Sequence, residues 1–187
     1  MKTLLTTLLL LFYLSNFSQI VVTPDGLKDS ENLENNYIVL EIEGKLQNEL
    51  YNNAIKYINE NYKNPNEVIT AKTENEYLKF DTYIPQMFYY NNSGAKIPID
   101  TKYTIELKFK DEKVKYEIVS IEMYNFNANL NKNIFVLFSG GLFDGYIIYK
   151  KNGNLFKEDT KLTIEKYFNS EITKLKEYLT GKIEENW

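Results

Sequence analysis

The side chains that most often carry out catalysis or bind metal ions are largely missing from this sequence. The chain has 187 residues with no His and no Cys, and all 22 of its basic residues are Lys. Ser-His-Asp triads, Cys nucleophiles, zinc sites built from Cys or His, and bidentate Arg clamps on phosphate all need the absent side chains. The sequence therefore predicts no metal site, no cofactor and no enzymatic activity.

Carboxylates are the remaining groups with catalytic potential. Glu41 and Glu43 share one face of a predicted strand, and Asp111 and Glu112 occupy a predicted turn. A glycoside hydrolase needs two carboxyl groups about 5 to 10 Å apart in a cleft, one of them with a raised pKa. Solvated surface positions are the commoner place for such pairs. A carboxylate-dependent hydrolase of envelope polysaccharide therefore stays an alternative, with Glu41 and Glu43 as its candidates.

Two groups of large apolar residues could contact a ligand or a protein partner. Aromatic side chains offer a wide contact surface with a polar edge, suited to sugar rings or peptides, whereas apolar groups beside glycines can form an adhesive surface. Burial against a sheet is the ordinary role of both. The aromatic group is Tyr83, Phe88, Tyr89 and Tyr90, and the apolar group is Phe135, Leu137, Phe138, Leu142 and Phe143.

Composition indicates one globular domain without a nucleic-acid partner. The length is near that of a single domain, and 43% of the residues are hydrophobic. The formal net charge of -4 argues against sequence-independent binding to DNA or RNA, which relies on a basic face. The abundance of Asn, Lys, Ile and Tyr is typical of an AT-rich genome, so the missing Arg mostly reflects base composition.

The first 18 residues have the layout of a secretory signal peptide. Lys2 precedes an apolar run from about Leu4 to Leu14, and a short polar segment follows. The run is too short to cross a bilayer core of about 30 Å, and no later segment reaches that length. We expect cleavage after Ser18 and export to the periplasm or the exterior. Because there is no Cys, the protein is not expected to be a lipoprotein.

The first half of the mature chain predicts an arm, a strand, a helix and further strands. Residues 19–36, an extended start at Ile20 to Thr23 followed by a polar stretch from Pro24 to Asn36, are expected to form a flexible amino-terminal arm, and the single domain is expected over 37–187. Residues 37–43 are strand-like. Apolar residues at steps of three and four predict a helix over 45–62. Short strands are expected over 67–72 and 77–84, the second ended by Pro85.

The second half predicts a hairpin, an apolar insertion and a long helix. Alternation over 101–110 and 113–118 indicates antiparallel strands with one wet face. The phase slips near Val119 and Ser120, which predicts a β-bulge that returns Ile121 and Met123 to the core. Residues 125–158 form an apolar hairpin insertion with a two-residue turn at Asn152-Gly153. A stripe from Leu162 to Ile183 predicts a helix over 160–184.

Two of these segments resemble a known family. The helix positions Glu49-Leu50-Tyr51, Ala54, Tyr57 and Ile58, with the hairpin Lys102–Phe109 to Lys115–Ile118, resemble secreted bacterial proteins grouped as domain of unknown function 4468. The likeness covers about residues 37–124. It implies a fold like that of TATA-binding protein, α+β, with a mostly antiparallel sheet packed by one early helix and one long C-terminal helix. It implies no activity, because the family has none assigned.

No motif in the sequence assigns a function, and three hypotheses remain after the excluded classes are set aside. The first hypothesis is an exported, non-enzymatic binding or interaction domain of the bacterial envelope, with residues 134–148 as the surface that contacts an envelope protein. The second is a carrier of small apolar ligands, because a curved sheet that grips a long helix can leave a cavity lined by Tyr and Phe. The hydrolase is the third.

Overall fold

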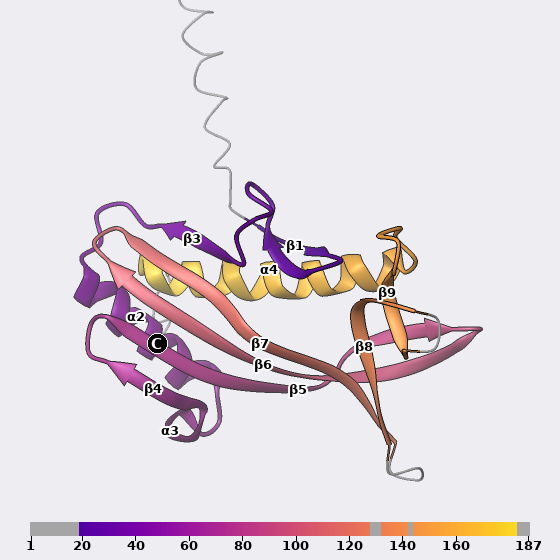
Figure 1. Cartoon of the computed structure of the whole chain (residues 1–187). Coiled ribbons are helices and arrows are strands. Elements are labelled where there is room, and N and C mark those ends of the chain that lie inside the picture. Colours follow the sequence, from indigo (N-terminus) through magenta and orange to yellow (C-terminus); the bar gives the residue numbers. More distant parts are fainter. Residues whose placement is uncertain (1–18, 128–131, 142–143, 183–187) are drawn as a thin grey trace, which may run out of the picture.

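The fold is an antiparallel sheet with two long helices packed on one face. A computed structural model describes residues 19–127, 132–141 and 144–182, so the predicted signal peptide lies outside the described residues. Figure 1 shows α2 and α4 on the same side of the sheet, with the strands curving beneath them. The elements are β1 (Ile20–Thr23), β2 (Gly26–Asp29), β3 (Tyr37–Glu41), α2 (Gln47–Asn61), α3 (Pro65–Val68), β4 (Ile69–Thr73), β5 (Tyr77–Asn92), β6 (Ala95–Lys110), β7 (Lys113–Asn127), β8 (Lys132–Gly140), β9 (Tyr146–Lys150) and α4 (Glu158–Thr180).

The strands follow one another across the sheet in sequence order from β4 to β9, with β3 added beside β7. Neighbouring pairs are antiparallel except β8 and β9, which are parallel. This arrangement, with one early helix and one long C-terminal helix, confirms the predicted α+β class.

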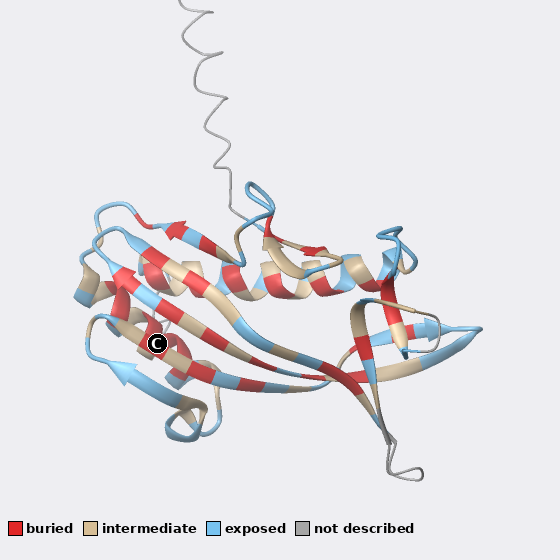
Figure 2. Cartoon of the chain, viewed as in Figure 1, coloured by how far each residue is buried: buried red, intermediate tan, exposed pale blue. Residues whose placement is uncertain are grey.

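Helix α4 buries one stripe of side chains along its whole length. The stripe consists of Thr160, Ile164, Phe168, Ile172, Leu175 and Leu179. Leu162 was expected on this stripe but is 53% exposed. Successive helical residues turn by about 100°, so Leu162 points roughly 200° away from both Thr160 and Ile164. Figure 2 shows the buried stripe turned toward the sheet. Ile183, which was also expected on the stripe, lies outside the described residues.

Strand β5 continues past the proline that was expected to end it. Residues 77–92 form one strand, and its register against β6 shifts between Ile84 and Phe88. Pro85 lies inside this irregularity, and Gln86 there has a φ of 51°. A bulge leaves residues unpaired, so the missing N–H of proline costs no ladder hydrogen bond. Strand β6 is correspondingly longer than predicted and begins at Ala95.

Strand β7 carries the predicted bulge. Ile105 pairs with Ile118 and Thr104 pairs with Ser120, which leaves Val119 without a partner on β6. Val119 is 40% exposed, whereas Met123 is buried. Because of the extra residue, inward side chains occupy even-numbered positions before the bulge and odd-numbered positions after it, as the slipped alternation predicts.

The amino-terminal arm is a correction to the sequence analysis. Residues 20–29 form an antiparallel hairpin, β1 with β2, rather than a flexible arm. Ile20 and Val22 are buried, and Figure 1 shows the hairpin lying on α4. The physical reason is that Ile20 and Val22 alternate with less buried residues, so one face of β1 can pack against the molecule.

The 125–158 insertion is only partly a hairpin. Strands β7 and β8 pair antiparallel from Tyr124 to Asn127, but β8 pairs with β9 in parallel. At Asn152-Gly153 only Gly153 has a positive φ, of 82°, and a single bridge joins Tyr149 to Leu155. The turn therefore forms without the predicted two-residue hairpin geometry, which needs positive φ at both central positions.

The segment between α2 and β4 also differs from the prediction. Pro65 begins the short helix α3, since proline is well suited to a first helical turn, and β4 follows only from Ile69. Within the described part of the chain, no helix is long and apolar enough to cross a membrane.

Candidate functional site

The structure separates the predicted aromatic group onto two faces of β5. Phe88 and Tyr90 are buried, and the Tyr90 hydroxyl donates to the carbonyl of Ile147 at 3.0 Å. Tyr83 and Tyr89 are each 51% exposed on the opposite face. Odd and even positions of a strand point to opposite sides, so this sequence cluster does not form one contact surface.

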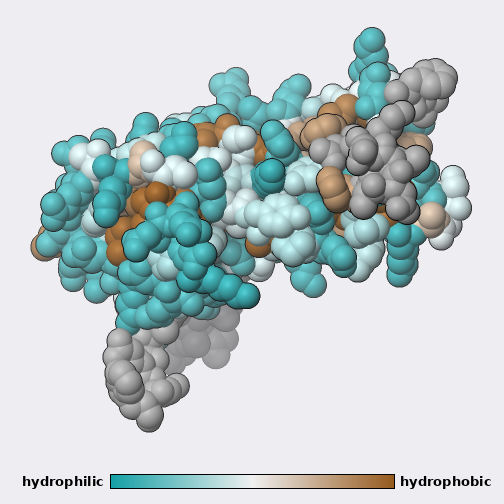
Figure 3. All heavy atoms as spheres, turned by 90° about the horizontal axis from the view of Figure 1, so that it is seen from below, coloured by the Kyte–Doolittle hydropathy of each residue, from teal (hydrophilic) through white to brown (hydrophobic). Residues whose placement is uncertain are grey.

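The predicted apolar group is spread along β8. Leu137 and Phe138 are partly buried, and Phe138 packs against the core. Phe135 is 42% exposed, with its ring centroid 6.0 Å from that of Tyr124. Leu142 and Phe143 lie outside the described residues. Figure 3, which shows the molecule from below, has separate hydrophobic areas within a mostly hydrophilic surface.

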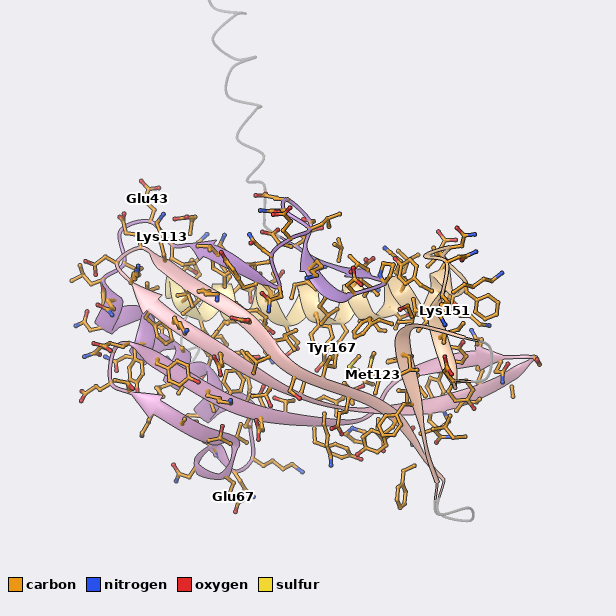
Figure 4. The ribbon with its side chains drawn as sticks, viewed as in Figure 1. Glu43, Glu67, Lys113, Met123, Lys151 and Tyr167 are labelled. Carbon is orange, nitrogen blue, oxygen red and sulfur yellow. The ribbon has the colours of Figure 1, made fainter. Side chains whose placement is uncertain are left out.

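The candidate carboxylate pairs lie at one end of the sheet. Glu41 and Glu43 are exposed, and Glu41 forms an ion pair with Lys113 at 3.1 Å. Figure 4 shows Glu43 pointing away from the molecule. Asp111 accepts a hydrogen bond from the backbone of Gln47, and Glu112 accepts one from the backbone of Gly44. The turn carboxylates therefore fix the chain before α2.

A different group of residues surrounds a hollow of about 1210 Å³ at the free edge of β5, beyond the pairing with β4. Its lining includes outward side chains of the sheet, such as Asp81 and Lys102, and inward ones, such as Thr82 and Tyr103. The hollow therefore wraps around the strand edge. We call the part between the helices and the sheet the tyrosine cleft. Its walls are Tyr57, Asn61, Tyr62, Thr82, Tyr103, Tyr167 and Glu171.

Four elements place the tyrosine cleft's side chains. Tyr57 lies on α2 and Tyr62 directly after it, Thr82 lies on β5, Tyr103 on β6, and Tyr167 and Glu171 on α4. Tyr167 points from α4 toward the sheet (Figure 4). The rings pack edge to face: the centroids of Tyr57 and Tyr62 are 6.3 Å apart, and so are those of Tyr103 and Tyr167. Such contacts fix the rings in a preferred geometry.

The hydroxyl groups in the tyrosine cleft are mostly paired with one another. Those of Tyr103 and Tyr167 lie 2.9 Å apart, and that of Tyr62 lies 3.1 Å from Oγ1 of Thr82. The Tyr57 hydroxyl donates to Oε2 of Glu171 at 3.1 Å. The walls of the tyrosine cleft thus combine aromatic carbon with hydrogen-bonding oxygen.

Burial keeps these tyrosines protonated. It is the largest cause that raises the pKa of Tyr57 and Tyr103, and neighbouring tyrosines add to the effect. Burial raises the pKa of Tyr167 to about 12. The tyrosine hydroxyls are therefore neutral near pH 7, and the carboxylate of Glu171 is the charge among them.

Two groups, one in the wall of the tyrosine cleft and one in the core, lack the partners that their burial would favour. Glu171 is partly buried, and among the described residues its carboxylate has a hydrogen bond from Tyr57 but no ion pair with a lysine. The hydroxyl of Tyr116 is buried and has no hydrogen-bond partner in the described chain. Burial, followed by the effects of Tyr62, Glu171 and Tyr167, raises its pKa well above the usual value. Tyr116 is not among the residues that line the hollow.

A second, smaller hollow lies between the amino-terminal segment, β3 and α4. Its volume is about 420 Å³, and Asp29, Glu41 and Lys176 are among its lining residues. No group of three or more acidic residues in the described part of the chain is arranged to hold a metal ion.

Sequence reasoning placed most tyrosines of the cleft correctly but did not single them out. Tyr57, Tyr62 and Tyr103 fall on predicted inward faces. Glu171 was missed, although a signal exists: it lies between the buried Phe168 and Ile172, four positions after Tyr167. An acidic residue beside the apolar stripe of a long helix indicates a polar pocket beneath that helix.

Comparisons with known proteins support the fold. No family model matches the sequence, and no curated protein matches it. Among solved structures, a DUF4468 family protein from Bacteroides ovatus is 14% identical with a TM-score of 0.50, covering 81% of this chain and 87% of its own. A TBP-like protein from Parabacteroides distasonis is 16% identical with a TM-score of 0.49, covering 75% and 90% respectively. The likeness to the DUF4468 family protein confirms the fold that the family resemblance implies.

Proposed function

We propose that this chain is an exported, non-enzymatic binding domain whose ligand site is the tyrosine cleft. The observation that carries the proposal is the partly buried Glu171, held among tyrosine hydroxyls in a hollow. A carboxylate removed from water loses solvation, and a ligand that supplies donors would restore part of that free energy. Export rests on the signal-peptide pattern of residues 1–18.

The lining supports a ligand with polar groups over a purely apolar one. A carrier of apolar molecules would leave Asn61, Thr82 and Glu171 beside the ligand without new partners, and such burial is costly. Ligand sites in proteins typically occupy about 300–1,000 Å³ and combine apolar walls with a few placed polar groups. The tyrosine cleft belongs to a hollow of comparable size and has both components.

The alternatives depend on other surfaces. A hydrolase that used Glu41 and Glu43 would work outside the larger hollow, because neither residue lines it. An envelope protein could instead contact β8, where Phe135 is 42% exposed beside Phe126 on β7, which is 62% exposed.

NMR of the ¹⁵N-labelled protein, in which backbone amide signals report ligand binding, tests the proposal. The purified protein is titrated with a library of amines, amino acids, sugars, nucleosides and fatty acids, and chemical shifts are followed by NMR. We expect at least one class to shift amides around Asn61, Tyr103 and Glu171. Glu171→Gln should alter the affinity of that class, whereas Phe135→Ser should not. Ligands that shift only β8 amides and are lost with Phe135→Ser would contradict the site.

A further inference from the structure

Glu171 is the charged side chain among the walls of the tyrosine cleft, although the rest of the hollow is lined by both lysines and carboxylates. Glu171 accepts a hydrogen bond from Tyr57 at 3.1 Å and forms no ion pair with any described lysine. Lys63, Lys102 and Lys174 line the same hollow, and all three are exposed. A partly buried carboxylate that has one neutral donor keeps unused acceptor capacity, because its two oxygens can accept about four hydrogen bonds.

The surrounding tyrosines suit a cation on two grounds. The faces of aromatic rings carry negative charge density and attract ammonium groups within about 6 Å. Hydroxyl oxygens also accept hydrogen bonds, and a hydroxyl that donates to a neighbour, as that of Tyr57 does to Glu171, keeps acceptor capacity. An ammonium group has N–H donors for Glu171 and for tyrosine oxygens. A neutral alcohol offers one donor and no charge.

We infer that the tyrosine cleft recognises a small organic cation through a protonated amine, with Glu171 as the counter-charge and tyrosine rings as the walls. This inference rests on the proposed function, since it names the class of ligand for the same site. An anion is disfavoured between the helices and the sheet, because it would lie against Glu171, whereas the lysines of the hollow, Lys63, Lys102 and Lys174, are exposed.

Three probes that share one ring and differ in charge test the inference. Benzylammonium, benzyl alcohol and benzoate carry positive, zero and negative charge at pH 7. In ¹⁵N NMR titrations of the purified protein, we expect benzylammonium to shift amides around Tyr103 and Glu171. It should bind about tenfold or more tightly than benzyl alcohol, as a charge-assisted hydrogen bond predicts. Benzoate should give no saturable shift.

A matched pair of variants on α4 isolates the carboxylate. Glu171→Gln keeps the side-chain volume and should lower the affinity for benzylammonium about tenfold, with benzyl alcohol within about twofold. Glu177→Gln, a change of the same type at an exposed position of the helix, should leave both affinities unchanged.

The outcomes separate this inference from the proposed function. If benzyl alcohol binds at the tyrosine cleft as tightly as benzylammonium, the binding site stands and the cationic class is overturned. Equal loss of both probes in Glu171→Gln would likewise overturn the role of charge. If none of the three probes shifts amides of the tyrosine cleft, the inference is overturned, and the wider library then decides whether the cleft binds anything.

Discussion

Tyrosine fills much of this interior because its ring packs like an apolar group while its hydroxyl keeps a polar end. The consequence is that each buried hydroxyl needs a partner, and the molecule supplies partners unevenly. Tyr103 has Tyr167, Tyr62 has Thr82 and Tyr57 has Glu171. Tyr116 has none in the described chain.

Removing two of these hydroxyls should have opposite effects on stability. Tyr103→Phe deletes a paired hydroxyl and leaves Tyr167 without its partner, so it should lower the free energy of unfolding by about 1–2 kcal/mol. Tyr116→Phe removes an unpaired buried hydroxyl and should change it by less than about 0.5 kcal/mol or raise it. Urea denaturation of the ligand-free proteins measures both. A larger loss from Tyr116→Phe than from Tyr103→Phe would contradict the assigned pairing.

Phe168 should be the costliest truncation on α4. Its side chain is fully buried and packs against the rings of Tyr103 and Tyr167. Phe168→Ala should lower the free energy of unfolding by about 3–5 kcal/mol because it leaves a cavity. The matched control is Leu162→Ala, which is exposed on the same helix and should cost less than about 0.5 kcal/mol. Similar denaturation midpoints for the two variants would contradict the described packing.

For individual residues, the sequence predicted which side chains point inward better than it predicted which of them contact one another. Period-two alternation places Tyr103 and Tyr116 on the core face of their strands. Alternation within a strand does not predict which residues of α4 these side chains contact. The contact between Tyr57 and Glu171 joins residues 114 positions apart, so it depends on how α2 and α4 pack.

At the scale of elements, the amino-terminal hairpin is joined to α4 by side-chain to backbone hydrogen bonds. Asn169 accepts from the backbone N–H of Ile20 and donates to the carbonyl of Ile20, each at 2.9 Å. Glu165 accepts from the backbone N–H of Val22 at 2.8 Å. The hairpin is thus attached at its first strand.

Asn169→Ala should loosen this hairpin without unfolding the sheet. Both bonds to Ile20 are lost, and backbone groups near Ile20 lose their partners, at a cost of about 1–3 kcal/mol. Hydrogen exchange should become faster over β1 and β2 while β6 keeps its protection. Ser170→Ala, at the exposed neighbouring position, serves as the control. Unchanged exchange over β1 and β2 in Asn169→Ala would show that the hairpin is held by other contacts.

Patterns in the sequence predicted those elements whose formation depends on neighbouring residues in the chain. The bulge at Val119 follows from a slip in alternation that is visible within one strand. The hairpin of residues 20–29 was missed because its partner Asn169 is 149 positions away. Strand β5 was cut short at Pro85 because proline usually ends a strand, and only the pairing with β6 shows that a bulge absorbs it.

At the scale of the whole molecule, buried tyrosines should govern stability at high pH. Burial raises the pKa of Tyr57, Tyr103, Tyr116 and Tyr167 in the folded state, whereas unfolded tyrosines titrate near 10. Below pH 10 both states are protonated and stability is constant. Above it the unfolded chain loses protons first, so each such tyrosine lowers the free energy of unfolding by about 1.4 kcal/mol per pH unit.

Absorbance of tyrosinate and near-ultraviolet circular dichroism, measured together from pH 8 to 12.5, test this expectation. Of the 16 tyrosines, the exposed ones should ionise first, and the rest should ionise together with the loss of tertiary structure. Complete ionisation near pH 10 with an unchanged dichroism spectrum would contradict the burial of the tyrosine hydroxyls.

The central claim is that the tyrosine cleft is where this protein binds its ligand. The most direct measurement is a map of amide shifts in the ¹⁵N NMR spectrum when benzylammonium is added to the wild-type protein and to Glu171→Gln. We predict saturable shifts that cluster at the end of α2, the middle of α4 and the facing part of β6, and that weaken about tenfold in the variant. Shifts confined to β8 would contradict the claim, whereas shifts at the tyrosine cleft that are equal in both proteins would overturn the role of Glu171 as the counter-charge.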